Sequence, residues 1–244
     1  MTIPFLEVED PWGALIKDLS EGGAKETLTI VRDGLLYLGG ELLLAEEHQW
    51  PDHEREAIKW LYQIESGSGL PKRVLDIGCG AGRLGRYLET HPDEKNHFEV
   101  HGIDGSTRMV QYCHQRGLGH THIMSLDDLP GPLKCYDAVV MLDNGIGLFT
   151  SAERLVDRLR VFHQMTYDWS ILLLAGVRPP GGIQVVTEQV RYGSVISPKV
   201  QSLEVSVEEL NPLANRSGWM VDGRVLGTQR GQYIARLVKN RVQL

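Results

Sequence analysis

A segment around residue 75 constrains the fold of this chain more than any other part of the sequence. It runs Val74-Leu75-Asp76-Ile77-Gly78-Cys79-Gly80-Ala81-Gly82-Arg83-Leu84: an apolar run with an acid, three glycines at alternate positions, and the start of an amphipathic pattern. This order predicts a buried strand, a tight turn and the first turn of a helix. Glycines let a ligand approach the backbone closely, and a helix N-terminus offers unpaired N–H groups and partial positive charge. We therefore expect a small-molecule site at this turn.

Strand and helix patterns alternate after this turn, which is typical of an α/β protein with a doubly wound, mostly parallel sheet. The sequence predicts a seven-stranded sheet, with strands at 73–77, 98–103, 121–124, 136–142, 171–177, 219–225 and 232–238. The expected helices lie at 82–90, 106–116, 151–167 and 207–217, and Ser206 with Glu209 forms a capping-box pattern before the last of them. We place the fifth strand ahead of Pro179-Pro180-Gly181-Gly182 and interpret these residues as its exit turn.

The residues before 71 predict an N-terminal cap on the substrate side, distinct from a cofactor-binding domain at 71–244. In segment 1–70 the patterns indicate a helix at 12–19, a strand at 27–31, an apolar stretch at 35–44 and a helix from Pro51 to about Ile64. An insertion at 178–206 interrupts the domain, because 183–192 and 200–207 alternate apolar and polar residues. We expect these two stretches to form an antiparallel pair that crosses the ligand edge of the sheet.

Composition and charge argue against several classes of function. The net charge of −7 and the pI near 5.7 disfavour a general nucleic-acid binder. No apolar run approaches the roughly 20 residues that span a bilayer, and acids at Glu7, Glu9 and Asp10 stand where a secretory signal would be basic. The cysteines are odd in number and far apart, so they indicate neither a disulfide framework nor a metal site. We expect a cytoplasmic monomer or homodimer without metal or membrane partners.

The glycine turn also fits a second kind of ligand. Gly80-Ala81-Gly82-Arg83-Leu84-Gly85 satisfies G-x-G-x-x-G, the fingerprint of dinucleotide-binding oxidoreductases. However, the glycine run begins at Gly78, and Asp76 stands at the end of the strand, where a carboxylate would repel a pyrophosphate. The same carboxylate can hold an ammonium group directly or through water. Asp76 therefore favours an amino-acid-like cationic ligand over a diphosphate.

A second strand-end acid sharpens this interpretation. Asp104 follows the apolar run of the second expected strand, 28 residues after Asp76. A carboxylate at that place in a doubly wound fold can accept hydrogen bonds from both hydroxyls of a ribose. The turn suits an ammonium and a carboxylate, and the acid beside it suits a ribose. S-adenosylmethionine carries all three of these groups. Two aspartates that merely cap helices are the alternative.

These residues carry a resemblance to a known family. The glycine turn resembles motif I of the class I S-adenosylmethionine-dependent methyltransferases, and the segment around Asp104 is similar to their motif II. The resemblance covers about residues 71–240 and includes Gly102-Ile103-Asp104-Gly105-Ser106 with Met109, the fourth-strand motif Tyr136 to Asn144, and Ser206-Val207-Glu208-Glu209-Leu210 followed by Ser217-Gly218-Trp219. It implies a Rossmann-like methyltransferase fold with S-adenosylmethionine as cofactor.

The resemblance also implies which residues contact the cofactor. Asp76, Gly78 and Gly80 would line its methionyl part, Asp104 its ribose, and Gly105 and Met109 its adenine. Relatives often place an aspartate after the third strand, where this chain has Ser125; its hydroxyl can take that role, or Asp127 can after a register shift. The expected contacts are Asp76, Gly78, Cys79, Gly80, Arg83, Asp104, Gly105, Met109, Ser125, Leu126 and Leu142. Arg83 is either a partner of the methionyl carboxylate or a solvated helix arginine.

The acceptor side of the reaction is harder to infer. Asp143 and Asn144 follow the fourth expected strand, whose carboxyl end faces the ligand crevice. Asn144 can orient an amine or a hydroxyl and Asp143 can accept its proton, although both residue types also serve as turn residues before Gly145-Ile146-Gly147. The sequence predicts a methyltransferase acting by in-line transfer on a small molecule or peptide. A non-catalytic cofactor-binding regulator is the alternative.

Overall fold

The larger of two β-sheets forms the centre of the molecule. The computed structural model describes residues 9–40, 42–65, 70–93, 96–129, 134–228 and 231–240. This sheet has seven strands in the order β11-β12-β7-β6-β3-β4-β5. Five strands are parallel, namely β3 (Lys72–Ile77), β4 (Phe98–Asp104), β5 (Thr121–Ile123), β6 (Tyr136–Met141) and β7 (Thr166–Val177), while β12 (Gln232–Lys239) and β11 (Trp219–Gly227) close the sheet as an antiparallel pair. The predicted seven-stranded, mostly parallel sheet is confirmed.

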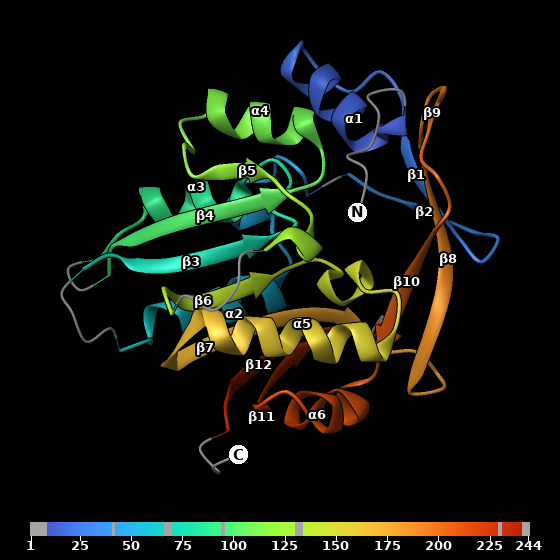
Figure 1. Ribbon diagram of the computed structural model, residues 1–244. Coiled ribbons are helices and arrows are strands. Elements are labelled where there is room, and N and C mark those ends of the chain that lie inside the picture. The colour runs from blue at the N-terminus through green and yellow to red at the C-terminus, as the bar shows by residue number, and fades with distance from the viewer. Residues whose placement is uncertain are drawn as a thin grey trace.

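Helices cover both faces of this sheet (Figure 1). On one face, α5 (Ala152–Met165) and α6 (Val207–Asn215) bury their apolar sides in a core with β3, β6, β7 and β12. On the other, α2 (Asp52–Tyr62) and α3 (Arg83–Thr90) share a second core with the same strands. The remaining helices, α1 (Pro11–Ser20) and α4 (Thr107–Gln115), pack on each other beside β5. No helix among the described residues is long and apolar enough to span a membrane.

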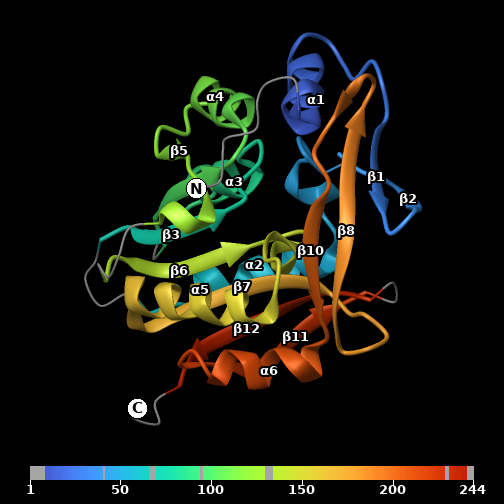
Figure 2. The ribbon, with the colours of Figure 1, turned by 45° about the vertical axis from the view of Figure 1, so that its right-hand side comes forward.

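A smaller, five-stranded sheet stands opposite the carboxyl ends of the parallel strands (Figures 1 and 2). It has the order β10-β8-β1-β2, with β9 (Val195–Ile196) paired to β8. The predicted antiparallel pair is β8 (Ile183–Tyr192) with β10 (Val200–Val205). The sequence did not predict that β1 (Leu28–Arg32) and β2 (Leu35–Leu38) extend this pair, with Ile30 opposite Val190. The exit turn at 179–182 leads the chain from one sheet to the other, as expected.

Strand β10 attaches the smaller sheet to the main core. The Leu203 N–H donates to the Phe149 carbonyl at 2.9 Å, and the Tyr233 hydroxyl donates to the Val205 carbonyl at 2.7 Å. Leu203 and Val205 are fully buried in the core formed with α5 and α6. The smaller sheet is thereby held close to η4 (Gly145–Leu148), the short helical turn that follows β6.

Candidate functional site

The glycine turn between β3 and α3 has the left-handed backbone that its sequence predicts. Gly78, Gly80 and Gly82 have φ values of 71°, 53° and 74°, a region that side chains rarely adopt. The N–H groups of Gly78 and Cys79 donate to the Ile103 carbonyl, which ties the turn to β4. A Cβ at Gly82 would also clash with Leu118. Gly82 is therefore needed for packing, whereas a Cβ at Gly78 or Gly80 would make only ordinary contacts, with Leu148 and Leu43.

Asp104 holds this turn and the start of α4 together. One carboxylate oxygen accepts the Gly80 N–H at 2.9 Å and the other accepts the Ser106 N–H at 2.8 Å. Burial raises the pKa of Asp104, and the backbone N–H groups of Ser106, Gly80 and Gly105 oppose that shift. A Cβ at the adjacent Gly105 would meet open space. The carboxylate thus lies next to space that a ligand could enter.

Asp76 is a buried carboxylate, 4% exposed, at the end of β3. Burial raises its pKa to about 7, and the negative charges of Asp104 and Glu54 add to this shift while Arg83 opposes it. At neutral pH the free protein therefore holds Asp76 on the boundary between its neutral and charged forms. A cation bound here would drive the group to its charged form.

Arg83 is engaged by a residue that the sequence analysis missed. Its guanidinium lies 2.6 Å from a carboxylate oxygen of Glu54 and 4.8 Å from the ring centroid of Trp50. Glu54 and Trp50 are buried at 2% and 3% exposure. The only local signal was that Glu54 stands in the first turn of a predicted helix. This pair joins α2 to the glycine turn, and a direct contact between Arg83 and the methionyl carboxylate stays a prediction.

Replacing Glu54 by glutamine should lower the free energy of unfolding by about 3 kcal/mol, because Arg83 would be left as a buried charge without its counter-ion. The matched control is Glu56→Gln on the same helix, which breaks an exposed pair with Lys59. That variant should stay within about 0.5 kcal/mol of the parent. Urea unfolding followed by circular dichroism measures both values. Equal effects of the two substitutions would show that the buried pair does not stabilise the fold.

The remaining predicted cofactor residues lie around the same edge. Met109 is buried on α4 against Ile16 and Ala81, Cys79 is buried in the turn, and Leu142 packs beside the core at the end of β6. Ser125 caps η3 (Leu126–Asp128), where its hydroxyl accepts the Asp127 N–H at 3.2 Å. Leu126 is half-buried against the core under α5. Geometry alone does not assign a cofactor contact to any of these side chains.

Asp10 is a second polar residue that the sequence analysis did not place near the site. Its carboxylate caps α1 by accepting the Gly13 N–H at 2.8 Å, and it accepts the Ser106 hydroxyl at 2.5 Å. It adds a negative charge near Asp104. The Asp10-Pro11 pair is a helix-start signal, but only the tertiary fold brings that start beside α4.

Asp143 and Asn144 follow β6 as predicted, and Asp143 has left-handed backbone. Asp143 has a φ of 56°, which is uncommon for a residue other than glycine. Its side chain is exposed at the sheet edge, yet surrounding protein atoms raise the pKa of its carboxyl; the charge of Glu54 adds to the shift, and Arg83 and Arg32 oppose it. The Asn144 side-chain oxygen is buried and, within the described part of the chain, has no hydrogen-bond partner.

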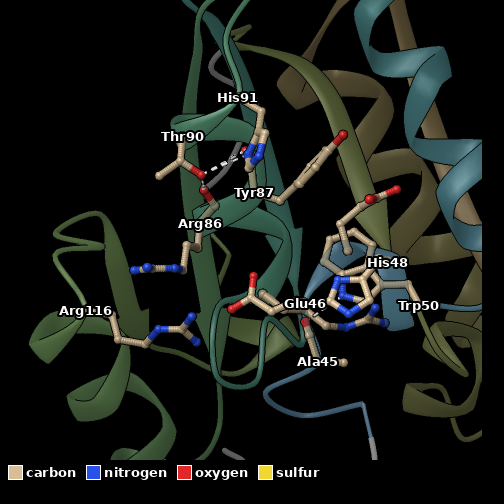
Figure 3. A pocket seen from close by; sticks show the side chains of 11 residues that line it. Ala45, Glu46, His48, Trp50, Arg86, Tyr87, Thr90, His91 and Arg116 are labelled. Carbon is tan, nitrogen blue, oxygen red and sulfur yellow. Dashed lines mark hydrogen bonds between the residues drawn. The ribbon is translucent and has the colours of Figure 1, made fainter.

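A cavity of about 170 Å³ lies against α3, between the Ala45–Trp50 segment and the end of α4 (Figure 3). Arg86 and Arg116 border one side of it, and Glu46 and His48 another. Arg83 and Trp50 contribute to its wall, but Asp76, Asp104 and Asp143 do not. This cavity is therefore separate from the edge where the three strand-end aspartates lie. Among the residues described, no group of three or more His, Cys, Asp or Glu side chains is arranged to hold a metal ion.

Comparison with known proteins agrees with this arrangement. Residues 74–165 match the family model described as a methyltransferase domain, and no curated protein sequence matches the chain. A SAM-dependent methyltransferase from Bacteroides fragilis, solved with S-adenosyl-L-homocysteine, is 20% identical, with a TM-score of 0.79 over 97% of this chain and 98% of the other. The CcbJ methyltransferase from Streptomyces caelestis is 14% identical, with a TM-score of 0.59 over 95% and 98%. The sugar N-methyltransferase KedS8 from a Streptoalloteichus species is 14% identical, with a TM-score of 0.53 over 79% and 90%.

The family match and the shared fold confirm the predicted class. Residues 74–165 match a methyltransferase domain, and nearly the whole chain shares the fold of a SAM-dependent methyltransferase. The dinucleotide alternative, which rested on the glycine pattern alone, is thereby superseded. The individual cofactor contacts and the acceptor stay predictions.

Proposed function

We propose that this protein transfers a methyl group from S-adenosylmethionine to an amine nitrogen of a small molecule or short peptide. The observation that carries this proposal is Asp143, a carboxylate that follows β6 at the same sheet edge as Asp76 and Asp104. In open α/β sheets ligands bind at this edge, outside the carboxyl ends of the strands. A carboxylate placed there can both attract an ammonium and accept its proton.

The residues at the edge fit the cofactor. Asp76 would pair with the ammonium of the methionyl group, and Asp104 would accept hydrogen bonds from the ribose hydroxyls. Gly105 and Met109 would border the adenine, with Ser125 and Leu126 beside it. Bound in this way, the cofactor supplies a methyl group already activated on a sulfonium.

The chain's own task is to present the acceptor and to manage its proton. An ammonium nitrogen has no free electron pair, so a cationic acceptor would first give a proton to Asp143, whose pKa is raised by the surrounding protein atoms. The neutral nitrogen would then take the methyl group in line, with a C–N bond replacing the C–S bond, whose electron pair stays on sulfur. Asn144 would orient the nitrogen.

Charges around Asp143 support a cationic acceptor. Glu54 is paired with Arg83, and Arg32 of the smaller sheet lies 2.5 Å from Glu188 and 2.8 Å from Glu204. Carboxylates thus outnumber cations here, which attracts a positively charged ligand. KedS8, a similar fold, is a sugar N-methyltransferase, which makes an amino group on a small polyol a reasonable first choice. We also propose that segments 1–70 and 178–206 enclose the acceptor, while 71–244 binds the cofactor.

The test is formation of S-adenosylhomocysteine with a panel of small amino sugars and their matched hydroxyl analogues. We expect turnover with at least one amine and none with its hydroxyl counterpart. Asp143→Asn should lower kcat about 100-fold, because the proton acceptor is lost. The control, Asp128→Asn at exposed η3, should leave kcat unchanged. Turnover of hydroxyl analogues alone would exclude the amine assignment, and cofactor binding without any turnover would favour the non-catalytic regulator.

A further inference from the structure

A buried hydroxyl in the smaller sheet adjoins the acceptor side of the proposed site. Ser202 of β10 is 1% exposed, and its hydroxyl has no hydrogen-bond partner among the described residues. A buried, unpaired polar group costs about 1–3 kcal/mol, and most buried polar groups are satisfied. An orphan of this kind therefore points to a partner that arrives with a ligand or with a rearrangement.

At the same place, Asn144 has a second buried polar atom without a partner in the described part of the chain. Its side-chain oxygen is also buried without a partner. Both side chains converge on Gly147 of η4: a Cβ built there would collide with the Asn144 amide nitrogen and lie 2.6 Å from the Ser202 hydroxyl. Gly147 does not have positive φ, so its backbone would accept alanine. The missing side chain at Gly147 is what leaves room for these two polar groups to approach each other.

Ser202 also belongs to the polar face of the smaller sheet. It lies opposite Val186 in the β8–β10 register, two residues before Glu204 on the same face. Glu204 binds Arg32, whose charge acts on Asp143. Asp143, Asn144 and Ser202 therefore face a common region, although they come from two different sheets.

We propose that Ser202 is a positioning residue, which donates its hydroxyl hydrogen to the Asn144 side-chain oxygen when the acceptor is bound and so fixes the Asn144 amide against the acceptor. This inference rests on the proposed function. It makes the smaller sheet part of the acceptor site rather than only a cover.

The variants Ser202→Ala, Ser202→Thr and Gly147→Ala test this role, with Ser170→Ala as the matched control. Ser170 is equally buried, but its hydroxyl donates to the Tyr136 carbonyl at 2.8 Å, at the opposite end of the sheet. Removing an unpaired hydroxyl should leave the Tm of Ser202→Ala unchanged or higher, whereas Ser170→Ala should lose about 2–4 °C. The Kd of S-adenosylhomocysteine should stay within about twofold in all variants, because none touches the cofactor.

For the amine that the wild-type enzyme methylates fastest, Ser202→Ala should lower kcat/KM about tenfold, with Ser202→Thr recovering most of it. Gly147→Ala should reproduce the loss, and Ser170→Ala should show none. A fall in Tm with unchanged kcat/KM in Ser202→Ala would overturn the proposal, since it would show a structural hydroxyl. A wild-type enzyme that methylates no amine would instead overturn the proposed function. In that case a crystal structure with S-adenosylhomocysteine that pairs Ser202 with a group other than Asn144 would exclude the positioning role.

Discussion

Replacing Asp104 by alanine is expected to raise the Kd of S-adenosylmethionine and of S-adenosylhomocysteine about 100-fold. The carboxylate is placed to accept hydrogen bonds from two ribose hydroxyls, and a hydrogen bond to a charged group contributes about 1.5–3 kcal/mol. Alanine also removes the acceptor of the Gly80 N–H, which lies in the glycine turn itself. Isothermal titration at pH 8 measures the two affinities.

The structural part of this effect can be separated from the ribose contact. 5′-Methylthioadenosine and its 2′-deoxy analogue differ only by one ribose hydroxyl, so wild-type protein should bind the first more tightly. In Asp104→Ala this preference should vanish, even if both ligands bind weakly because the turn has shifted. Asp157→Ala, which removes an exposed carboxylate paired with Arg160 on α5, is the control and should keep the preference. A preference retained by Asp104→Ala would exclude Asp104 as the ribose acceptor.

The affinity for S-adenosylmethionine is expected to fall about tenfold for each pH unit below 7, and to level off above pH 8. Asp76 has a pKa of about 7 in the free protein, because burial disfavours its charge and Asp104 and Glu54 add repulsion. The ligand's ammonium favours the charged carboxylate, so a proton bound to the free protein at low pH must be released on binding. Titrations between pH 5.5 and 8.5 in two buffers of different ionisation enthalpy measure both the affinity and the proton release.

The raised pKa of Asp76 also predicts how the stability of the ligand-free protein depends on pH. The pKa of Asp76 is raised above its unfolded value of 3.8, so the folded state binds more protons than the unfolded state between about pH 4 and 7. The contribution of Asp76 to stability is therefore present at low pH and is lost as the pH rises toward 7. Asp76→Asn should abolish both pH dependences and weaken binding at pH 8. A variant that retains the full pH dependence of binding would assign it to another group.

Local sequence patterns predicted the main sheet and its glycine turn well, because the signals are short-range. Left-handed backbone at Gly78, Gly80 and Gly82 follows from residue type, and alternating strand and helix patterns admit few topologies. The strand-end positions of Asp76, Asp104 and Asp143 follow from the same patterns. Since carboxyl ends of parallel strands share one edge, the sequence also predicted that these acids lie on one side of the sheet.

Burial and pairing between distant segments were decided by the tertiary structure. Leu35, Leu36 and Leu38 are apolar but exposed, since they form the edge strand of the smaller sheet, a position that composition does not reveal. The pairing of β1 with β8 joins residues about 160 positions apart, for which the chain carries no local signal. Helix α2, expected in a separate cap, packs on the main sheet and brings Glu54 to Arg83.

The sequence by itself predicted a methyltransferase fold and the sheet edge at which we expect the methyl donor to bind, because glycines and strand-end acids act through backbone geometry that is local to the chain. The tertiary structure alone decided which groups surround Asp143 and Asn144, where we propose that the acceptor binds. Glu54, Arg32 and Ser202 come from three segments far apart in the sequence. They come near Asp143 and Asn144 because β10 docks against η4 and because α2 shares a core with α3, where Glu54 pairs with Arg83. Contacts of this kind depend on long-range packing, whose energy is spread over many residues.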